Sequence, residues 1–184
     1  WFWGNSVANS EKPKKEKLAF RKDFRLPDGK TVRSAGAIGA VDGQYTAYLN
    51  RSEILSAKGA KKLSSSPGIL FNGNRNNQLI IVAENRTPKG HDPGFFFALR
   101  IEFTDGTDMI VRSDASWTAI DKVPKGRPTE RWKIETLPWS PVTAVSRTAW
   151  SEVVDPVISK TLAGASVGTD RAVRSSILKS NDLM

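Results

Sequence analysis

Polar side chains that could bind a small ligand are concentrated between two apolar runs of the chain. They are Asn85, Arg86, His91 and Asp92, with glycines at 90 and 94 beside them. Arg86 could donate a fork of hydrogen bonds to neighbouring hydroxyls, and Asp92 could accept hydrogen bonds from them. Trp117 could cover the apolar face of a ring if it lies nearby. The competing interpretation places Trp117 in the core, since tryptophan is mostly buried on average, and gives the loop residues no ligand.

One sequence pattern of nucleophilic catalysis, G-x-S-x-G, occurs in the chain, with Ser166 as its serine within residues 164–168. This G-x-S-x-G pattern works when the serine sits on an elbow between a strand and a helix and a histidine follows later in the chain. The single histidine, His91, precedes Ser166, and no strong strand pattern comes before the serine. We therefore expect a flexible segment of small residues there, and no catalytic residue.

Metal binding is restricted by the residue types present. The chain has no cysteine and one histidine, which removes thiolate sites and clustered histidine sites for zinc. Calcium takes oxygen ligands, so a structural calcium stays an open alternative. The candidates lie in predicted loops: Asp42, Asn72, Asn74 and Asn77. Asparagine and aspartate are also the ordinary residues of turns, which is the interpretation we prefer.

Glycoside hydrolysis needs two carboxyl groups that face one bond. Asp105, Asp108 and Asp114 have the right chemistry, but Asp105 belongs to an Asp-Gly turn and no pattern pairs the other two. We predict a chain that is not an enzyme, and keep an unrecognised glycoside hydrolase as an alternative.

The net charge of +9 raises the alternative of polyanion or nucleic-acid binding. The dense basic run lies in residues 11–17, where Pro13 and Glu16 interrupt the lysines, as in a solvated loop. The charge distribution therefore disfavours a nucleic-acid partner. No apolar run approaches the roughly 20 residues that a membrane helix needs, so we predict no membrane partner.

The elements that must position these residues are short strands. In residues 95–104, Phe97, Leu99 and Ile101 share one parity while Arg100 and Glu102 share the other, which predicts a central antiparallel strand with an inward apolar face. Asp105-Gly106 then predicts a hairpin into residues 109–112. Alternation or short apolar runs predict further strands in residues 17–26, 31–41, 44–50, 79–83 and 132–137. A polar loop is expected at residues 72–77.

Many short strands with Asp-Gly punctuation and no long helical pattern predict an all-β, antiparallel β-sandwich over residues 1–150. Residues 151–184 are expected to form a short, mostly irregular or helical C-terminal tail or connector, in which Asp170 could cap a helix. The chain starts at Trp1, and we read both ends as cuts in a longer polypeptide.

The order of landmarks resembles the galactose-binding-like jelly-roll modules beside the catalytic domains of α-L-rhamnosidases and other glycoside hydrolases. The landmarks are residues 1–3, 20–24, 42–50, 77–84, 105–106 and 113–117. The resemblance covers about residues 1–150, and departs from the family where Asn50-Arg51 replaces a common Asn-Gly turn. Residues 171–184 are similar to a segment of planctomycete multidomain proteins that carry c-type cytochrome domains and domains of unknown function.

The resemblance implies a non-catalytic carbohydrate-binding or scaffolding module, in some members with a structural calcium. A saccharide and the neighbouring domains of the parent chain would be its partners. The parent would be an exported bacterial protein, periplasmic, cell-surface or extracellular, that acts in polysaccharide use. We place the predicted saccharide site at Asn85, Arg86, His91, Asp92 and Trp117.

Overall fold

The computed structural model describes residues 2–3, 17–41, 43–59, 64–71, 75–85, 94–128 and 132–144. All of them lie in Trp1–Arg147, the first of the two units into which the chain divides. The predicted division at residue 150 and the predicted tail stay predictions, because residues 145–184 lie outside this description. Within the described ranges, no helix has the length and apolar character to cross a membrane.

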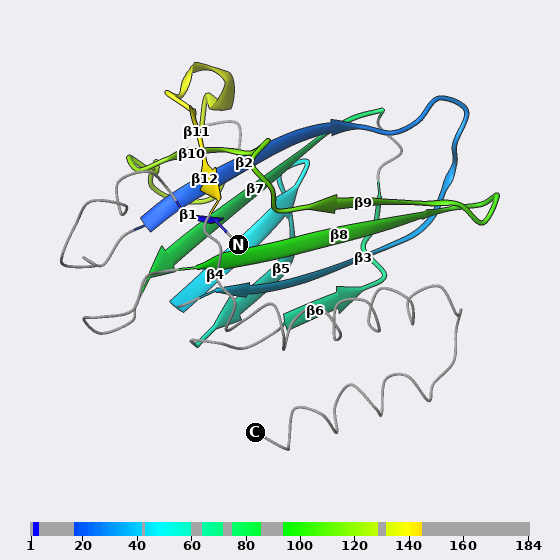
Figure 1. Ribbon diagram of the computed structural model, residues 1–184, viewed down its shortest axis with the longest axis horizontal. Coiled ribbons are helices and arrows are strands. Elements are labelled where there is room, and N and C mark those ends of the chain that lie inside the picture. The colour runs from blue at the N-terminus through cyan, green and yellow to red at the C-terminus, as the bar shows by residue number, and fades with distance from the viewer. Residues whose placement is uncertain are drawn as a thin grey trace. The chain divides into compact units, whose positions relative to one another are not determined.

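The strands form two antiparallel sheets that face each other, which confirms the all-β sandwich (Figure 1). Sheet A has the order β12-β1-β8-β3-β6, with β9 also paired to β8. Its strands are β1 (Phe2–Trp3), β3 (Val32–Val41), β6 (Ser64–Pro67), β8 (Phe95–Phe103), β9 (Asp108–Arg112) and β12 (Thr143–Ala144). Sheet A therefore holds β8 in its interior, as the sequence predicts.

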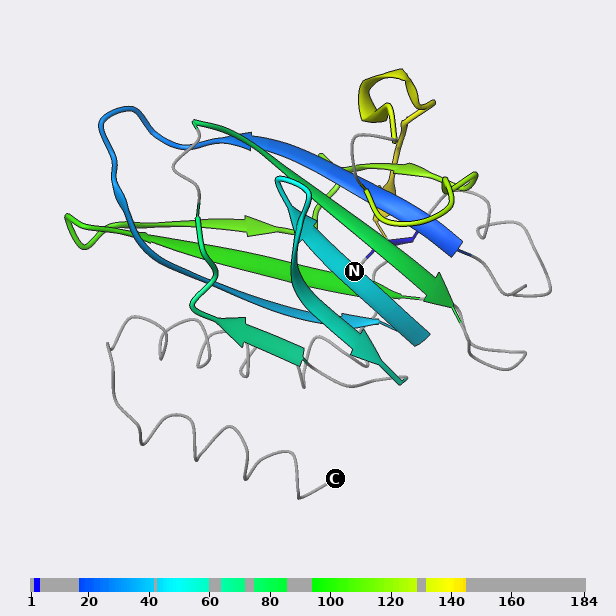
Figure 2. The ribbon, with the colours of Figure 1, turned by 180° about the vertical axis from the view of Figure 1, so that it is seen from behind.

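Sheet B has the order β11-β10-β2-β7-β4-β5. Its strands are β2 (Lys17–Arg25), β4 (Gly43–Leu49), β5 (Ser52–Lys58), β7 (Asn76–Asn85), β10 (Thr118–Ile120) and β11 (Ser140–Pro141). Figure 2 shows β2, β7, β4 and β5 side by side across this layer. The chain passes from β2 in sheet B to β3 in sheet A and back to β4, so the Asp-Gly turn at 28–29 lies in a link between the sheets, and Gly43 is the first residue of β4.

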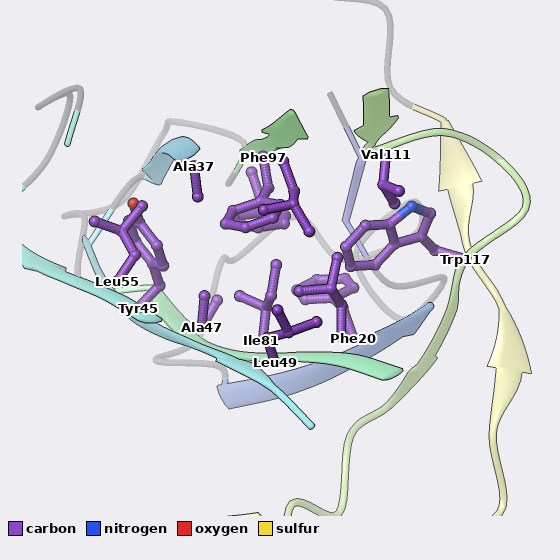
Figure 3. Packing of buried hydrophobic residues seen from close by; sticks show 14 of the residues in the cluster. Phe20, Ala37, Tyr45, Ala47, Leu49, Leu55, Ile81, Phe97, Val111 and Trp117 are labelled. Atoms are coloured by element: carbon purple, nitrogen blue, oxygen red, sulfur yellow. The ribbon is translucent and has the colours of Figure 1, made fainter. Parts of the chain in front are cut away.

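The core lies between the sheets and follows the predicted parity. Phe97, Leu99 and Ile101 on β8 have no exposed surface, which confirms that they point inward. The ring of Phe20 from sheet B stacks on that of Phe95 from sheet A, with centroids 5.3 Å apart. Figure 3 shows how side chains from the two sheets meet in this layer. Burial of so much apolar surface is the main source of stability for the sandwich.

The β8–β9 hairpin at Asp105-Gly106 is confirmed, with Gly106 in the left-handed region at a φ of 83°. The Asp105 carboxylate accepts hydrogen bonds from the Lys30 ammonium group and from the hydroxyl and backbone N–H of Thr107. These hydrogen bonds, the one from Lys30 first, lower the pKa of Asp105 from 3.8 to about 2. Asp105 therefore has a structural role in the turn.

The β4–β5 turn has the backbone conformation of an Asn-Gly turn, although its second residue is Arg51. Asn50 and Arg51 both have positive φ, at 48° and 72°, as a two-residue hairpin turn requires. The Asn50 side chain holds the turn against β7: its amide donates to Asn77 Oδ1 at 2.8 Å, and its carbonyl accepts from the Gln78 backbone N–H at 2.9 Å. Asparagine tolerates this conformation, whereas Arg51 adopts it in the position where glycine is common.

The strand predicted at residues 132–137 is wrong. The structure has a short 3₁₀ helix there, η2 (Ile134–Thr136), closed by a backbone hydrogen bond from Thr136 to Lys133. Trp132 and Ile134 are both buried against the outer face of sheet B, and this gives the same alternation as a strand. The predicted polar loop is also shorter than expected, because β7 already starts at Asn76.

We expect Gly39→Ala to lower the free energy of unfolding by about 1 to 3 kcal/mol. A Cβ atom on Gly39 would meet the Tyr45 hydroxyl oxygen at 2.6 Å and a ring carbon of Phe97 at 3.2 Å. Tyr45 is held by a hydrogen bond with Ser64, so its ring has little room to move. Chemical denaturation measures the change.

The matched control for this prediction is Gly36→Ala on the same strand. A Cβ atom there makes only ordinary contacts, the nearest at 3.6 Å from the backbone oxygen of Ser66. We expect Gly36→Ala to change stability by no more than about 0.5 kcal/mol. Equal losses for the two variants would contradict the close approach at Gly39.

Candidate functional site

The described members of the predicted loop site do not form an open site. Asn85 is 2% exposed at the end of β7, where it pairs with Gly43 of β4. Arg86, His91 and Asp92 lie outside the described residues, so their role stays a prediction. Of the five predicted residues, the structure describes Asn85 and Trp117, and both are buried.

Trp117 is a core residue, which corrects its predicted role as an exposed face. Its side chain is 1% exposed, and its ring meets that of Phe97 edge-on with centroids 6.4 Å apart. The indole N–H donates to the backbone oxygen of Arg112 at 2.9 Å (Figure 3 shows the ring among its neighbours). Burial of both the ring and its polar nitrogen leaves no surface on which a sugar could stack.

The carboxylates considered for glycoside hydrolysis are engaged in structure. Asp108 accepts a hydrogen bond from Arg100 Nε at 2.7 Å, and Asp114 accepts from the backbone N–H of Ser116 at 2.9 Å. Partial burial is the largest single influence on the pKa of Asp114 and raises it. The hydrogen bonds from Ser116, with the charges of Lys22 and Arg112, outweigh burial and lower the pKa overall. Each of the three carboxylates, Asp105 included, therefore has a structural hydrogen-bond partner.

For calcium, Asn77 is the one candidate that the structure describes. Its side chain is buried, with Oδ1 accepting from Asn50 and Nδ2 donating to the backbone oxygen of Arg75 at 3.2 Å. Asp42, Asn72 and Asn74 lie outside the described residues. No cluster of three or more His, Cys, Asp or Glu side chains occurs within the described ranges.

The outer face of sheet B instead aligns side chains in rows across four strands, and the first of these rows is entirely polar. In the first row, Lys17 of β2 lies opposite Glu84 of β7, Glu84 opposite Gln44 of β4, and Gln44 opposite Lys58 of β5. The second row holds Ala19, Val82, Thr46 and Ser56 in the same order. Directly opposed residues lie on one face of a sheet, so each row presents its side chains together.

These rows line a groove with a volume of about 410 Å³. Gln44 and Glu84 are the middle pair of the first row, and Gln44 Nε2 donates a hydrogen bond to Glu84 Oε2 at 2.8 Å. Tyr48 also contributes to the lining, but it is only 6% exposed. Burial first, and then the negative charge of Glu53, raise the pKa of the Tyr48 hydroxyl, so it stays protonated at neutral pH. The remaining lining residues include Lys17, Thr46, Ser56, Lys58, Val82 and Gly126.

A small apolar cluster also lies on the outer face of sheet B and contacts Val82 of the groove lining. Trp132 and Ile134 pack on Ala19 and Ile80 of sheet B. Beyond this cluster, Arg21 joins β2 to η2 through ion pairs at 2.6 Å to Asp23 and at 2.7 Å to Glu135. That second region also has hollows, and in one of them Arg21 is already paired with Asp23 and Glu135.

The groove can act as a hydrogen-bonding site for a polar ligand. Among its described lining residues, Glu84 carries the single carboxylate, so they lack the facing carboxylate pair that glycoside hydrolysis requires. An amide, a carboxylate, hydroxyls and ammonium groups together can donate to and accept from neighbouring hydroxyls. This donor set fits binding better than bond cleavage.

Sequence reasoning did not find this groove. Lys17 and Glu84 are 67 positions apart in the chain, and they become neighbours only through the register of β2 with β7. The usable signal was the polar parity of residues 44–50, where Gln44 and Thr46 alternate with inward Tyr45 and Ala47. That alternation identifies an outward face but not its partners on other strands.

The fold is similar to that of several solved structures. The lectin of Pleurotus ostreatus in its apo form matches with a TM-score of 0.61 and 24% identity, over 79% of this chain and 41% of the lectin chain. The same lectin in complex with GalNAc matches with a TM-score of 0.58 and 20% identity, over 78% of this chain and 42% of that chain. The chain thus spans less than half of the lectin it matches.

The α-L-rhamnosidase of Streptomyces avermitilis, in complex with L-rhamnose, matches with a TM-score of 0.60 and 19% identity, over 78% of this chain and 14% of the enzyme. No protein-family model and no curated protein sequence matches the chain. At these identities the likeness establishes the fold alone, and it confirms the antiparallel β-sandwich predicted from the sequence.

Proposed function

We propose that the chain is a non-catalytic carbohydrate-binding module of a larger exported protein that acts in polysaccharide use. The observation that carries the proposal is the groove on sheet B, which is lined by the hydrogen-bonded pair Gln44 and Glu84 together with hydroxyl and ammonium groups. Two solved structures of this fold support it, because a lectin is in complex with GalNAc and a rhamnosidase with L-rhamnose. Scaffolding of neighbouring domains is the function that remains if no saccharide binds.

The loop at residues 86–93 keeps a place in this proposal. It follows β7 directly after Glu84 and Asn85, and Glu84 lines the groove. Arg86, His91 and Asp92 are therefore proposed as additional ligand contacts. Asn85 and Trp117 are not, because both are buried.

Calorimetric titration with a panel of neutral and charged saccharides tests the proposal. We expect dissociation constants in the micromolar to millimolar range, since each neutral hydrogen bond contributes about 0.5 to 1.5 kcal/mol. Gln44→Ala and Glu84→Gln should each weaken binding about 2- to 13-fold, with unchanged melting temperatures. Arg86→Ala and Asp92→Ala should do the same if the loop contributes.

Gln78→Ala is the matched control. It removes an amide, as Gln44→Ala does, but from a position on β7, the strand of Glu84, that is outside the groove lining. Binding that is equally sensitive to Gln78 and Gln44 would contradict the groove. If no saccharide on the panel binds, scaffolding becomes the function. Hydrolysis of a glycoside that Glu84→Gln abolishes would show an enzyme instead.

A further inference from the structure

The described lining of the groove offers no open aromatic face. Tyr48 is almost fully buried, and Trp117 lies in the core between the sheets. Trp132 and Trp139 belong to the apolar cluster beside η2, where their indole N–H groups donate to the backbone oxygens of Lys125 and Ile134. Neither tryptophan lines the groove, so within the described lining hydrogen bonds and charge must select the ligand.

Charge in the groove is arranged with ammonium groups at both ends of one row. Lys17 and Lys58 occupy the outer positions, and the Gln44–Glu84 pair lies between them. Both lysines are exposed, and neither forms an ion pair with a residue that the structure describes. By contrast, Arg21 beside η2 is paired with two carboxylates.

We infer that the groove binds an acidic saccharide, with carboxylates on its sugar rings held by Lys17 and Lys58 and its hydroxyls by Gln44 and Glu84. This inference rests on the proposed function and names its ligand class. An ammonium group forms charge-assisted hydrogen bonds to a carboxylate that are stronger than those between neutral groups. The Glu84 carboxylate accepts hydrogen bonds from ligand hydroxyls, in addition to the one that the Gln44 amide donates to it.

The spacing of the row indicates an oligosaccharide. Lys17 and Lys58 are three strand spacings apart, so their Cα atoms are separated by about 14 Å. At that separation, both ammonium groups could hold one carboxylate only if the two lysine side chains bent toward each other over Gln44 and Glu84. Two acidic groups along a chain that crosses β2, β7, β4 and β5 satisfy both lysines. Affinity should therefore rise from an acidic monosaccharide to its trimer.

The test compares tri-galacturonate with its methyl ester, which keeps the rings and removes the charges. Calorimetry on the full chain should show binding of the acid at least about 5-fold tighter than the ester. Lys17→Gln and Lys58→Gln should each weaken binding of the acid about 2- to 10-fold and leave binding of the ester unchanged. Raising the salt concentration from about 50 to about 500 mM should weaken binding of the acid more than binding of the ester, because salt screens exposed charges.

Arg33→Gln is the matched control, since it removes one positive charge from β3 in the other sheet. It should leave binding of the acid unchanged, and melting curves should be the same for all three variants. If the acid and the ester bind equally well, and the two lysine variants do not change affinity, the inference of an acidic ligand is overturned. The proposal of carbohydrate binding would remain.

Two other outcomes have different meanings. If neither the trimer nor any neutral sugar binds, the proposed function itself fails. If a single-stranded DNA of equal charge binds more tightly than the trimer, and Lys17→Gln and Lys58→Gln weaken it, the groove is a polyanion site and the saccharide inference is wrong.

Discussion

Trp117→Ala is expected to lower the free energy of unfolding by about 3 to 5 kcal/mol. The substitution would leave a cavity beside Phe97 and Val111, between β8 and the β10 side of the sandwich. It also removes the indole N–H that bonds to the backbone oxygen of Arg112, at the end of β9. Chemical denaturation followed by circular dichroism measures the loss.

Trp117→Phe is the control that separates packing from ligand contact. It keeps an apolar ring in the core but loses the bond to Arg112, so we expect a smaller loss than for alanine. Saccharide affinity of the folded Trp117→Phe protein should equal that of the parent. A stable variant with weakened sugar binding would show that the ring contacts ligand after all.

Leu99→Ala is expected to cost about 2 to 5 kcal/mol of stability. Leu99 has no exposed surface and lies on β8 between Ala37 of β3 and Val111 of β9, so the strands on both sides limit how far the site can collapse. The loss is measured as a shift of the denaturation midpoint at constant slope.

Ile110→Ala on the adjacent strand removes as many carbon atoms from an exposed position. Ile110 is 47% exposed, and we expect a change within about 0.5 kcal/mol. A loss below about 0.5 kcal/mol for Leu99→Ala as well would mean that β8 lies at the surface, contrary to the structure.

Local alternation was sufficient to predict the strands that form the core. Phe97, Leu99 and Ile101 share a parity that no helix could place on one face, and the run at residues 79–83 is short and apolar enough to lie in the centre of a sheet. Aspartate-glycine pairs predicted the turns for a similarly local reason, because glycine adopts positive φ without strain. These features depend on neighbours within a few residues.

The failures have the opposite cause, which is dependence on partners far away in sequence. Trp132 and Ile134 alternate like a strand because they rest on sheet B, and nothing local distinguishes that placement from strand pairing. Trp117 could be core or ligand face until its surroundings are known. The groove requires the register of four strands, and a shift of one residue would turn Glu84 toward the core.

Because the row from Lys17 to Lys58 lies on the outer face of sheet B, its residues can change ligand preference without changing the core that stabilises the fold. Each of its four residues comes from a different strand, and its strand neighbours along the chain include core residues such as Leu18, Tyr45 and Ala83. Exchanges at 17, 44, 58 and 84 change what the outer face offers while the volume between the sheets stays constant. The sandwich can thus diverge in specificity by four surface substitutions, and a library randomised at these positions would sample new ligands on an unaltered scaffold.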